Sequence, residues 1–390
     1  MADDPLMKPG VQAKKSEARL LSVHEPISKR FLSVGQIQHT IGVGWNCTAT
    51  LVAGVEAPPR DKPALILTAG HCAAGTTGDN EVVIDRPMGE GWFFVPSYFH
   101  DNQDEHRKVP IVKILYSSMK RTDIGILQLG ETYGELLDRG LKPVLLAPAT
   151  TAPMEIEMAH IPVGLFPDRF MRYSACITRD SATVFELANE YPEERLDHPW
   201  LWPRAIPNDC VGVYGGSSGS PVFIKDKSEI SAVISTATDA RPRDCGYVGI
   251  PCEVEDGQAT VKESTVYLAA TDTLIGTLKA DGTFDPSTLD PGNSINLQRQ
   301  ARWDSPPGQW NLIADDAYES IRFKTGQADK THCEDPAGYG VATPVINQPL
   351  LSLPTPPEPG IYTVCAIGKR PGSEQWQPYS QATAKLRKIE

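Results

Sequence analysis

Three residue types that can together activate a hydroxyl group occur in separate short blocks of the chain. The stretch "YGGSSGSPVF" carries Ser217 and Ser218 among glycines, "ALILTAGHC" carries His71, and "RTDIGILQL" carries Asp123. A serine hydroxyl is a weak nucleophile until a neighbouring base takes its proton and a third group orients that base. If the fold brings these blocks together, they predict nucleophilic hydrolytic chemistry.

Two serines compete for the role of nucleophile. Gly215-Gly216-Ser217-Ser218-Gly219 fits the G-x-S-x-G elbow of α/β-hydrolases, which would make Ser217 the nucleophile. In that fold the histidine follows the serine, and the one histidine downstream, His332, stands beside Cys333. His71 and Asp123 instead precede both serines. The order His, Asp, Ser therefore selects Ser218 and excludes the elbow.

These sequence blocks also resemble those of a known protein family. "CTATLV", "LILTAGHC", "DIGILQL" and "GGSSGSPVF" are similar to the catalytic blocks of chymotrypsin-like serine peptidases, above all the bacterial trypsin-like and glutamyl-endopeptidase branches. The similarity covers about residues 31–280. It implies His71 as general base, Asp123 as the group that fixes the tautomer of His71, and Ser218 as nucleophile. The backbone N–H groups of Gly216 and Ser218 would form the oxyanion hole.

The same resemblance bears on substrate preference. It places the pocket floor at Gly212 and Val213, and it makes the strand of Ser235, Thr236 and Ala237 the one that pairs with substrate. No carboxylate stands at the floor to hold a basic residue, and the histidine position of the glutamate-cleaving branch is Ile234. We therefore expect a small or apolar residue before the cut, with Asp239 and Asp244 as charged residues that could still reach the pocket.

Ser217 is a departure from the animal enzymes. It stands where many of them carry an aspartate that binds a newly cut N-terminus. Activation by that ion pair is not expected here, and the question of a zymogen stays open.

The chain contains eight cysteines, which predict up to four disulfides and an oxidising compartment. The resemblance implies the pair Cys47–Cys72, beside the histidine. The other expected pairs are Cys176–Cys210, Cys245–Cys252 and Cys333–Cys365, with Cys210–Cys245 as an alternative. Close Cys-x-x-Cys pairs are missing, so neither a metal nor a cofactor is expected. A cytoplasmic protein with eight free thiols is the less favoured interpretation.

The elements that must position these residues are short β-rich segments separated by turns, in a chain with 32 glycines and 34 prolines. They predict an all-β fold. With the resemblance, we expect two antiparallel six-stranded β-barrels of the chymotrypsin type plus a small C-terminal β-sandwich-like domain. The expected boundaries are 1–30 for an N-terminal extension, 31–278 for the peptidase domain, 279–306 for a linker and 307–390 for the C-terminal domain.

Charge and hydropathy limit the partners. A net charge of −12 argues against nucleic acid and anionic membranes, and the apolar runs are too short to span a bilayer. "MADDPLMKPG" lacks the apolar core of a signal peptide, so we expect a mature secreted or periplasmic chain that acts on protein or peptide substrates. The C-terminal domain is a possible site for a docking partner.

Two further interpretations remain for the same residues. A catalytically idle peptidase scaffold could serve as a binding protein, with recognition by the C-terminal domain, and the triad could hydrolyse activated esters alone. The remaining histidines are interpreted as surface or structural residues: His24, His39, His100, His106, His160 and His198.

Overall fold

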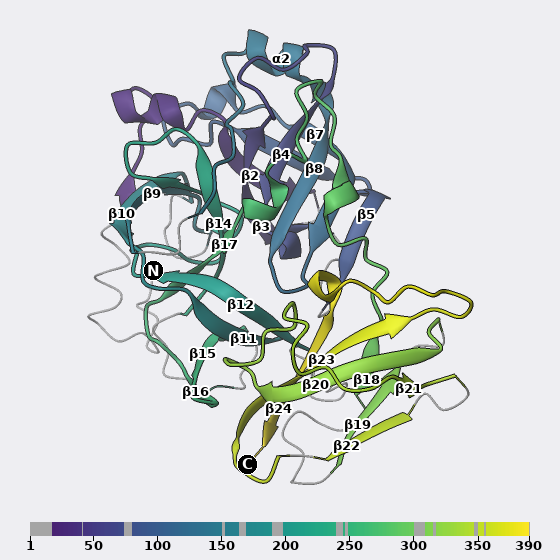
Figure 1. The fold of residues 1–390 in the computed structure, drawn as a ribbon. Helices are drawn as coiled ribbons and strands as arrows, with labels where there is room; N and C mark the ends of the chain where they lie inside the picture. The colour runs from purple at the N-terminus through teal and green to yellow at the C-terminus, as the bar shows by residue number, and fades with distance from the viewer. Residues whose placement is uncertain are drawn as a thin grey trace.

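The computed structural model describes residues 18–389 except 41, 74–79, 150–152, 164–168, 189–197, 239–244, 246–248, 300–308, 315–316, 347–349 and 355. Strands dominate these residues (Figure 1). The helices described are short: α2 (Tyr133–Asp138) and single 3-10 turns at Pro26–Arg30, Gly70–Cys72, Gln103–Glu105, Asp272–Leu274, Pro286–Thr288 and Tyr379–Gln381.

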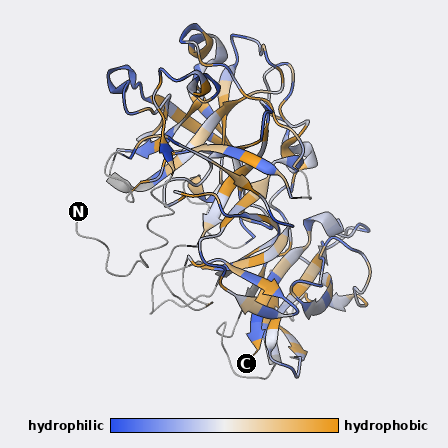
Figure 2. Ribbon diagram, turned by 90° about the vertical axis from the view of Figure 1, so that its left-hand side faces the viewer, coloured by the Kyte–Doolittle hydropathy of each residue, from blue (hydrophilic) through white to orange (hydrophobic). Residues whose placement is uncertain are grey.

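The first barrel is a closed antiparallel sheet. Its strands follow the order β7-β6-β2-β3-β4-β8, and β8 pairs again with β7, which closes the ring. Alternate side chains of these strands point inward, and buried aliphatic and aromatic residues fill the interior. Figure 2 shows hydrophobic residues recurring along the ribbons of this sheet. The strands are β2 (Val34–His39), β3 (Gly42–Val52), β4 (Pro63–Thr68), β6 (Trp92–Pro96), β7 (Val109–Ser118) and β8 (Ile124–Thr132), with β5 (Val82–Pro87) added on β7.

The second barrel uses the middle of a longer sheet. Its strand order is β10-β9-β13-β14-β17-β12, and an antiparallel bridge between Thr178 and Asn208 joins the far ends of β10 and β12. The strands are β9 (Glu155–His160), β10 (Arg172–Ile177), β12 (His198–Asn208), β13 (Pro221–Ile224), β14 (Ile230–Ala237) and β17 (Val266–Ala270). The short strand β1 (Arg19–Leu20) adds to the outer edge of β10.

Strand β12 is longer than its barrel partners and continues into an extension. There it pairs with β11 (Ala182–Ala188), which pairs in turn with β15 (Cys252–Glu255), and β16 (Gln258–Thr260) forms the edge. Phe185 and Leu187 on β11 share an apolar cluster with Ile361 and Leu386 of the C-terminal sheet. The extension therefore connects the second barrel to the end of the chain.

The C-terminal region contains two small sheets that face each other across a common core. One sheet has the order β18-β19-β22 and the other β21-β20-β23-β24. Trp310 and Leu312 from the first sheet pack with Ile321, Val364 and Ala366 from the second. The strands are β18 (Leu297–Arg299), β19 (Gln309–Ala314), β20 (Ser320–Gln327), β21 (Thr343–Pro344), β22 (Leu350–Pro354), β23 (Gly360–Lys369) and β24 (Thr383–Ile389). The predicted fold class is confirmed: an all-β chain with two barrels and a sandwich-like C-terminal unit.

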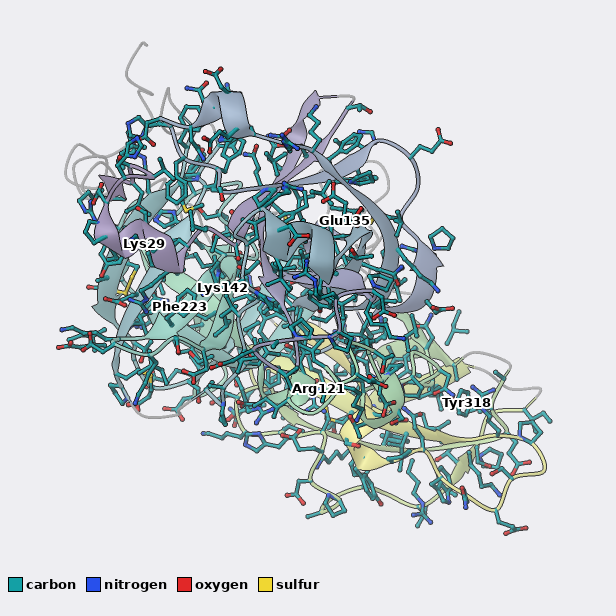
Figure 3. All side chains as sticks on the ribbon, turned by 90° about the horizontal axis from the view of Figure 1, so that it is seen from above. Lys29, Arg121, Glu135, Lys142, Phe223 and Tyr318 are labelled. Atoms are coloured by element: carbon teal, nitrogen blue, oxygen red, sulfur yellow. A yellow bond between two sulfur atoms is a disulfide. The ribbon has the colours of Figure 1, made fainter. Side chains whose placement is uncertain are left out.

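The C-terminal region also contacts the first barrel through a buried cation. Lys120, which is 5% exposed, places its Nζ 2.6 Å from Asp290 Oδ2 and 2.5 Å from the carbonyl oxygen of Gln381, and it also contacts Ser294 Oγ. The next residue, Arg121, forms an ion pair with Glu334 and is labelled in Figure 3 against the C-terminal ribbons. Both cations precede β8, so the C-terminal region holds the segment that leads into this strand.

Candidate active site

His71 lies on a short 3-10 turn that follows β4. The turn is held close to β7, since a Cβ atom added to Gly70 would stand 2.2 Å from the carbonyl oxygen of Ser118. The disulfide between Cys72 and Cys47 ties the same turn to β3. The imidazole is therefore fixed at the edge of the first barrel, and about a third of the side chain, 32%, remains exposed.

Asp123 stands at the start of β8 and is 1% exposed. Its carboxylate accepts three hydrogen bonds. The backbone N–H of His71 donates to Oδ1 at 2.9 Å, the His71 ring contacts Oδ2 through Nδ1 at 2.8 Å, and the Ser235 hydroxyl donates to Oδ2 at 2.7 Å. Since an ionised carboxylate can only accept, Nδ1 carries a proton and Nε2 is left as the basic nitrogen.

The two charges reinforce each other. Burial raises the pKa of Asp123, but the charge and hydrogen bond of His71, with the donors from Ser235 and the backbone, lower it below its usual value overall. Burial lowers the pKa of His71, yet the charge and hydrogen bond of Asp123 raise it above its usual value overall. The pair therefore combines an ionised acid with a histidine of increased basicity.

Ser218 reaches the same place from the second barrel, on the loop between β12 and β13. Two backbone hydrogen bonds anchor its neighbourhood to the first barrel and to β14: Thr48 N–H donates to Ser218 O at 2.8 Å, and Gly219 N–H donates to Ile234 O at 2.7 Å. Gly219 has φ of +79°, and a Cβ there would lie 2.3 Å from Thr48 O, so this position requires glycine.

Ser218 and His71 line one cleft of about 400 Å³ together with Asp123. Within the described part of the chain, the Ser218 hydroxyl makes no hydrogen bond to His71. Bonds between a nucleophile and its base commonly tighten only when substrate is bound. The structure thus brings all three predicted catalytic residues to one cleft, with a direct bond between His71 and Asp123.

The predicted oxyanion donors lie on the same loop. Gly216 has φ of +96°, and a Cβ at this residue would stand 2.7 Å from Val163 Cγ2 and 2.8 Å from the carbonyl oxygen of Ile161. The Thr48 hydroxyl donates to Gly216 O at 2.9 Å, which fixes the orientation of that peptide. Among the described residues, the N–H groups of Gly216 and Ser218 donate to no protein acceptor. They are free to bind an anionic oxygen.

Most of the predicted substrate-binding residues also line the cleft. Val213, Ser235, Thr236 and Ala237 do so, together with Ile234 and Ile250. Gly212 does not line this cleft and instead borders a small separate cavity with Cys210 and Val266. The alternatives Asp239 and Asp244 lie outside the described residues.

The sequence analysis missed a carboxylate in this cleft. Glu186 on β11 is 7% exposed, lines the cleft and accepts a hydrogen bond from the Thr236 hydroxyl at 3.1 Å. Burial raises its pKa to about 7, although His71 opposes this shift. Trp200 and Trp202 of β12 complete this wall with stacked rings whose centroids are 6.1 Å apart.

The structure also shows a buried histidine next to Ser217, one of the histidines interpreted from the sequence as surface or structural residues. His160, at the end of β9, is 0% exposed and contacts Ser217 Oγ through Nδ1 at 3.2 Å. Its Nε2 lies 3.0 Å from Ser174 Oγ. Strand periodicity carried a signal for this residue, because Ile156, Met158 and His160 share one face of β9 and all three are buried.

All eight cysteines form disulfides, and Cys210 pairs with Cys176 rather than with Cys245. The four bonds are Cys47–Cys72, Cys176–Cys210, Cys245–Cys252 and Cys333–Cys365. A ring nitrogen of His71 and the sulfurs of Cys47 and Cys72 lie within 4.8 Å of one another, close enough to share one metal ion. Both sulfurs are oxidised in one disulfide, which removes the thiolates that such a site would need.

The chain has no match among protein-family models or among curated protein sequences. Several solved structures are similar to part of it. Thermostable serine protease AL20 from an extremophilic microorganism is 13% identical, covers 62% of this chain and 92% of its own, and has a TM-score of 0.37. Protease Anisep from Arthrobacter nicotinovorans is 16% identical over 61% and 90%, with a TM-score of 0.37. Human heparin binding protein is 14% identical over 65% and 90%, with a TM-score of 0.38.

Proposed function

We propose that this protein is a serine endopeptidase that hydrolyses peptide bonds through His71, Asp123 and Ser218. The observation that carries the proposal is the Asp123–His71 pair: a buried carboxylate at 2.8 Å from Nδ1 leaves Nε2 basic in a cleft that Ser218 also lines. The backbone N–H groups of Gly216 and Ser218, which donate to no acceptor in the described part of the chain, can supply what the developing oxyanion requires.

The proposed reaction follows from these positions. Ser218 Oγ attacks the carbonyl carbon while His71 Nε2 takes the hydroxyl proton, and Asp123 stabilises the imidazolium. The oxyanion accepts hydrogen bonds from the N–H groups of Gly216 and Ser218. The imidazolium then gives its proton to the leaving amine, which leaves an acyl group on Ser218. A water molecule, deprotonated by His71, attacks the acyl-enzyme and releases the acid with regeneration of the hydroxyl.

The walls of the cleft support a preference for a small or apolar residue before the cut. Val213, Ala237 and Ile250 are apolar, and no charged side chain from 212–214 enters the cleft. Glu186 also lines the cleft, but burial raises its pKa to about 7, so this carboxyl group is partly neutral at neutral pH. Four disulfides support secretion or a periplasmic location. None of the described helices has the length and apolar character required to cross a membrane.

The proposal is tested with a peptidyl phosphonate probe and a denatured proteome digest. The wild-type protein should be labelled and should cleave peptides, Ser218→Ala should do neither, and Ser217→Ala should still be labelled to completion. If Ser217→Ala alone abolished labelling, the assignment of Ser218 as the nucleophile would be wrong. A wild-type protein that neither reacts nor cleaves would indicate an idle scaffold that binds through its C-terminal region. Hydrolysis of activated esters without any peptide cleavage would limit the activity to esters.

A further inference from the structure

The segment of residues 211–217, called the nucleophile loop below, has its two ends linked to each other through the buried side chains of Ser174 and His160. Ser174 Oγ donates to the carbonyl oxygen of Val211, at the start of the loop, at 2.6 Å. His160 bridges Ser174 Oγ and Ser217 Oγ, at 3.0 and 3.2 Å. At the end of the loop, the N–H of Tyr214 donates to Ser217 Oγ at 3.3 Å. His160, Ser174 and Ser217 are 0%, 3% and 1% exposed.

The donor and the acceptor of each hydrogen bond in this series, from Val211 through His160 to Tyr214, can be assigned. A carbonyl oxygen only accepts, so the Ser174 proton points to Val211, and Ser174 Oγ must accept the Nε2–H of His160. The ring is then unprotonated at Nδ1, which accepts the Ser217 proton, and Ser217 Oγ accepts from Tyr214. Burial, helped by the charge of Arg172, lowers the pKa of His160 to about 3, so the neutral ring persists at neutral pH.

The loop held by these hydrogen bonds contains several groups that the proposed reaction needs. Gly216 supplies one oxyanion N–H, Ser218 follows Ser217 directly, and Val213 and Tyr214 line the cleft. A further bond, from Val163 N–H to Gly215 O at 2.6 Å, holds the outer side of the loop. Loss of the His160 link would free the inner side.

We propose that His160 is a positioning residue that, with Ser174 and Ser217, holds the nucleophile loop in its catalytic conformation without a newly cut N-terminus. This inference rests on the proposed function and adds how the site is kept active. The placement of residues 18–20 agrees with it. Arg19 and Leu20 pair with the outer edge of β10, and Arg172 Nη1 donates to Ala18 O at 2.7 Å, so this segment lies along the sheet edge. The imidazole, in turn, already occupies the space behind Ser217.

Two substitutions at His160 separate positioning from plain burial. In His160→Asn the amide oxygen lies close to the place of Nδ1, so it can still accept from Ser217. In His160→Gln the amide nitrogen lies close to the place of Nε2, so it can keep the Ser174 bond while the Ser217 bond is lost. Ser174→Ala has a matched control in Ser231→Ala, since Ser231 is 4% exposed on β14 and also donates to a backbone carbonyl, that of Val222.

The experiment measures melting temperature, kcat and KM on one peptide, and the fraction of protein titrated by a phosphonate. We expect His160→Gln and Ser174→Ala to lower kcat about ten- to a hundredfold, near the loss of one oxyanion donor. His160→Asn and Ser231→Ala should stay within about threefold of wild type. Equal kcat in His160→Gln and wild type, or equal effects of Ser174→Ala and Ser231→Ala, would overturn the proposal.

Two further measurements keep the inference testable if a His160 variant fails to fold or the wild type is inactive. Nitrogen-15 NMR of the full chain should show His160 neutral at pH 5 with its proton on Nε2, and a proton on Nδ1 would contradict the chain of bonds. A wild type unreactive to phosphonate would refute the proposed function, and the NMR measurement would still test the hydrogen bonds of His160. A short N-terminal tag should leave kcat unchanged, and activity that appears only after its removal would overturn the inference.

Discussion

Ser235 donates its hydroxyl to the carboxylate oxygen of Asp123 that also contacts His71, at 2.7 Å. The serine comes from β14 of the second barrel, and the aspartate directly precedes β8 of the first, so this hydrogen bond joins the two barrels at the cleft. The carboxylate is completely buried, and each of its donors has a measurable share in keeping it ionised.

Ser235→Ala should reduce stability at neutral pH by about 1.5–3 kcal/mol, the usual contribution of a hydrogen bond to a charged group. The pKa of folded Asp123 lies below its unfolded value of 3.8, so its ionisation stabilises the protein above that pH. This stabilisation disappears as the pH falls through the lower, folded pKa. Urea unfolding over a series of pH values from 7 downward should show that the difference in stability between variant and wild type narrows once the folded carboxyl group begins to take up a proton. A difference that stays constant while the wild type loses stability through protonation of Asp123 would contradict this account.

The pH dependence of activity should follow His71. Only its neutral form can take the proton of Ser218, and Asp123 raises the pKa of His71 above 6.5. We therefore expect kcat/KM to be low in acid and to rise as the pH passes through a value above 6.5. Asp123→Asn should lower kcat on the order of 10⁴-fold. Initial rates on one peptide between pH 5 and 9 test both statements, and an Asp123→Asn variant as fast as wild type would refute the role of the aspartate.

Glu186 should make the protein less stable as the pH rises. Its folded pKa of about 7 lies above the unfolded value of 4.5, so ionisation is harder in the folded state. The loss of stability begins near pH 4.5, grows to about 3 kcal/mol and is complete above pH 7. Glu186→Gln should remove this loss, so the variant should exceed wild type in urea unfolding at pH 8 and not at pH 4. If the free energies of unfolding of the two proteins changed in parallel with pH, the ionisation of Glu186 would not destabilise the folded state.

The buried pair of Lys120 and Asp290 should contribute to both stability and rate. Asp290→Ala leaves an ammonium buried without its partner, which typically costs about 3–5 kcal/mol. Because Lys120 lies three residues before Asp123, we also expect kcat to fall. Lys113→Ala is the matched control, since its pair with Asp85 lies on the same barrel with side chains 34% and 69% exposed. That change should cost less than about 1 kcal/mol.

Unfolding and kinetics of the two variants test this contrast. Similar losses in Asp290→Ala and Lys113→Ala would mean that the buried contact has no special importance. The double variant Lys120→Met/Asp290→Leu provides a further check, because it removes both charges and should lose less stability than Asp290→Ala.

The all-β character of the chain could be predicted from the sequence because alternation and turn residues are local signals. The choice of Ser218 over Ser217 came from the order of three blocks along the chain. That order can be read directly from the sequence, but it identifies a catalytic group only in a fold that brings together β4, β8 and the loop before β13. The resemblance supplied that fold, and residue spacing alone would not have done so.

Glu186 and His160 could not be assigned from the sequence in the same way. Their importance comes from partners on distant segments: Thr236 for Glu186, and both Ser174 and Ser217 for His160. Nothing in "TVFELA" or "MEIEMAH" reveals these neighbours. The periodicity of β9 identifies His160 as a buried residue and stops there, since burial alone does not tell which polar groups complete its hydrogen bonds.

The contact at Lys120 limits how far this chain can be treated as a set of interchangeable modules. Its ammonium needs oxygens from Asp290, Ser294 and Gln381, all located after residue 278. Barrels joined to a tail that lacks these oxygens would leave an uncompensated cation in the contact between barrel and tail, next to the strand that begins after Asp123. In engineering or in evolution, the residues after 278 and the two barrels should therefore be exchanged together, as one inherited piece.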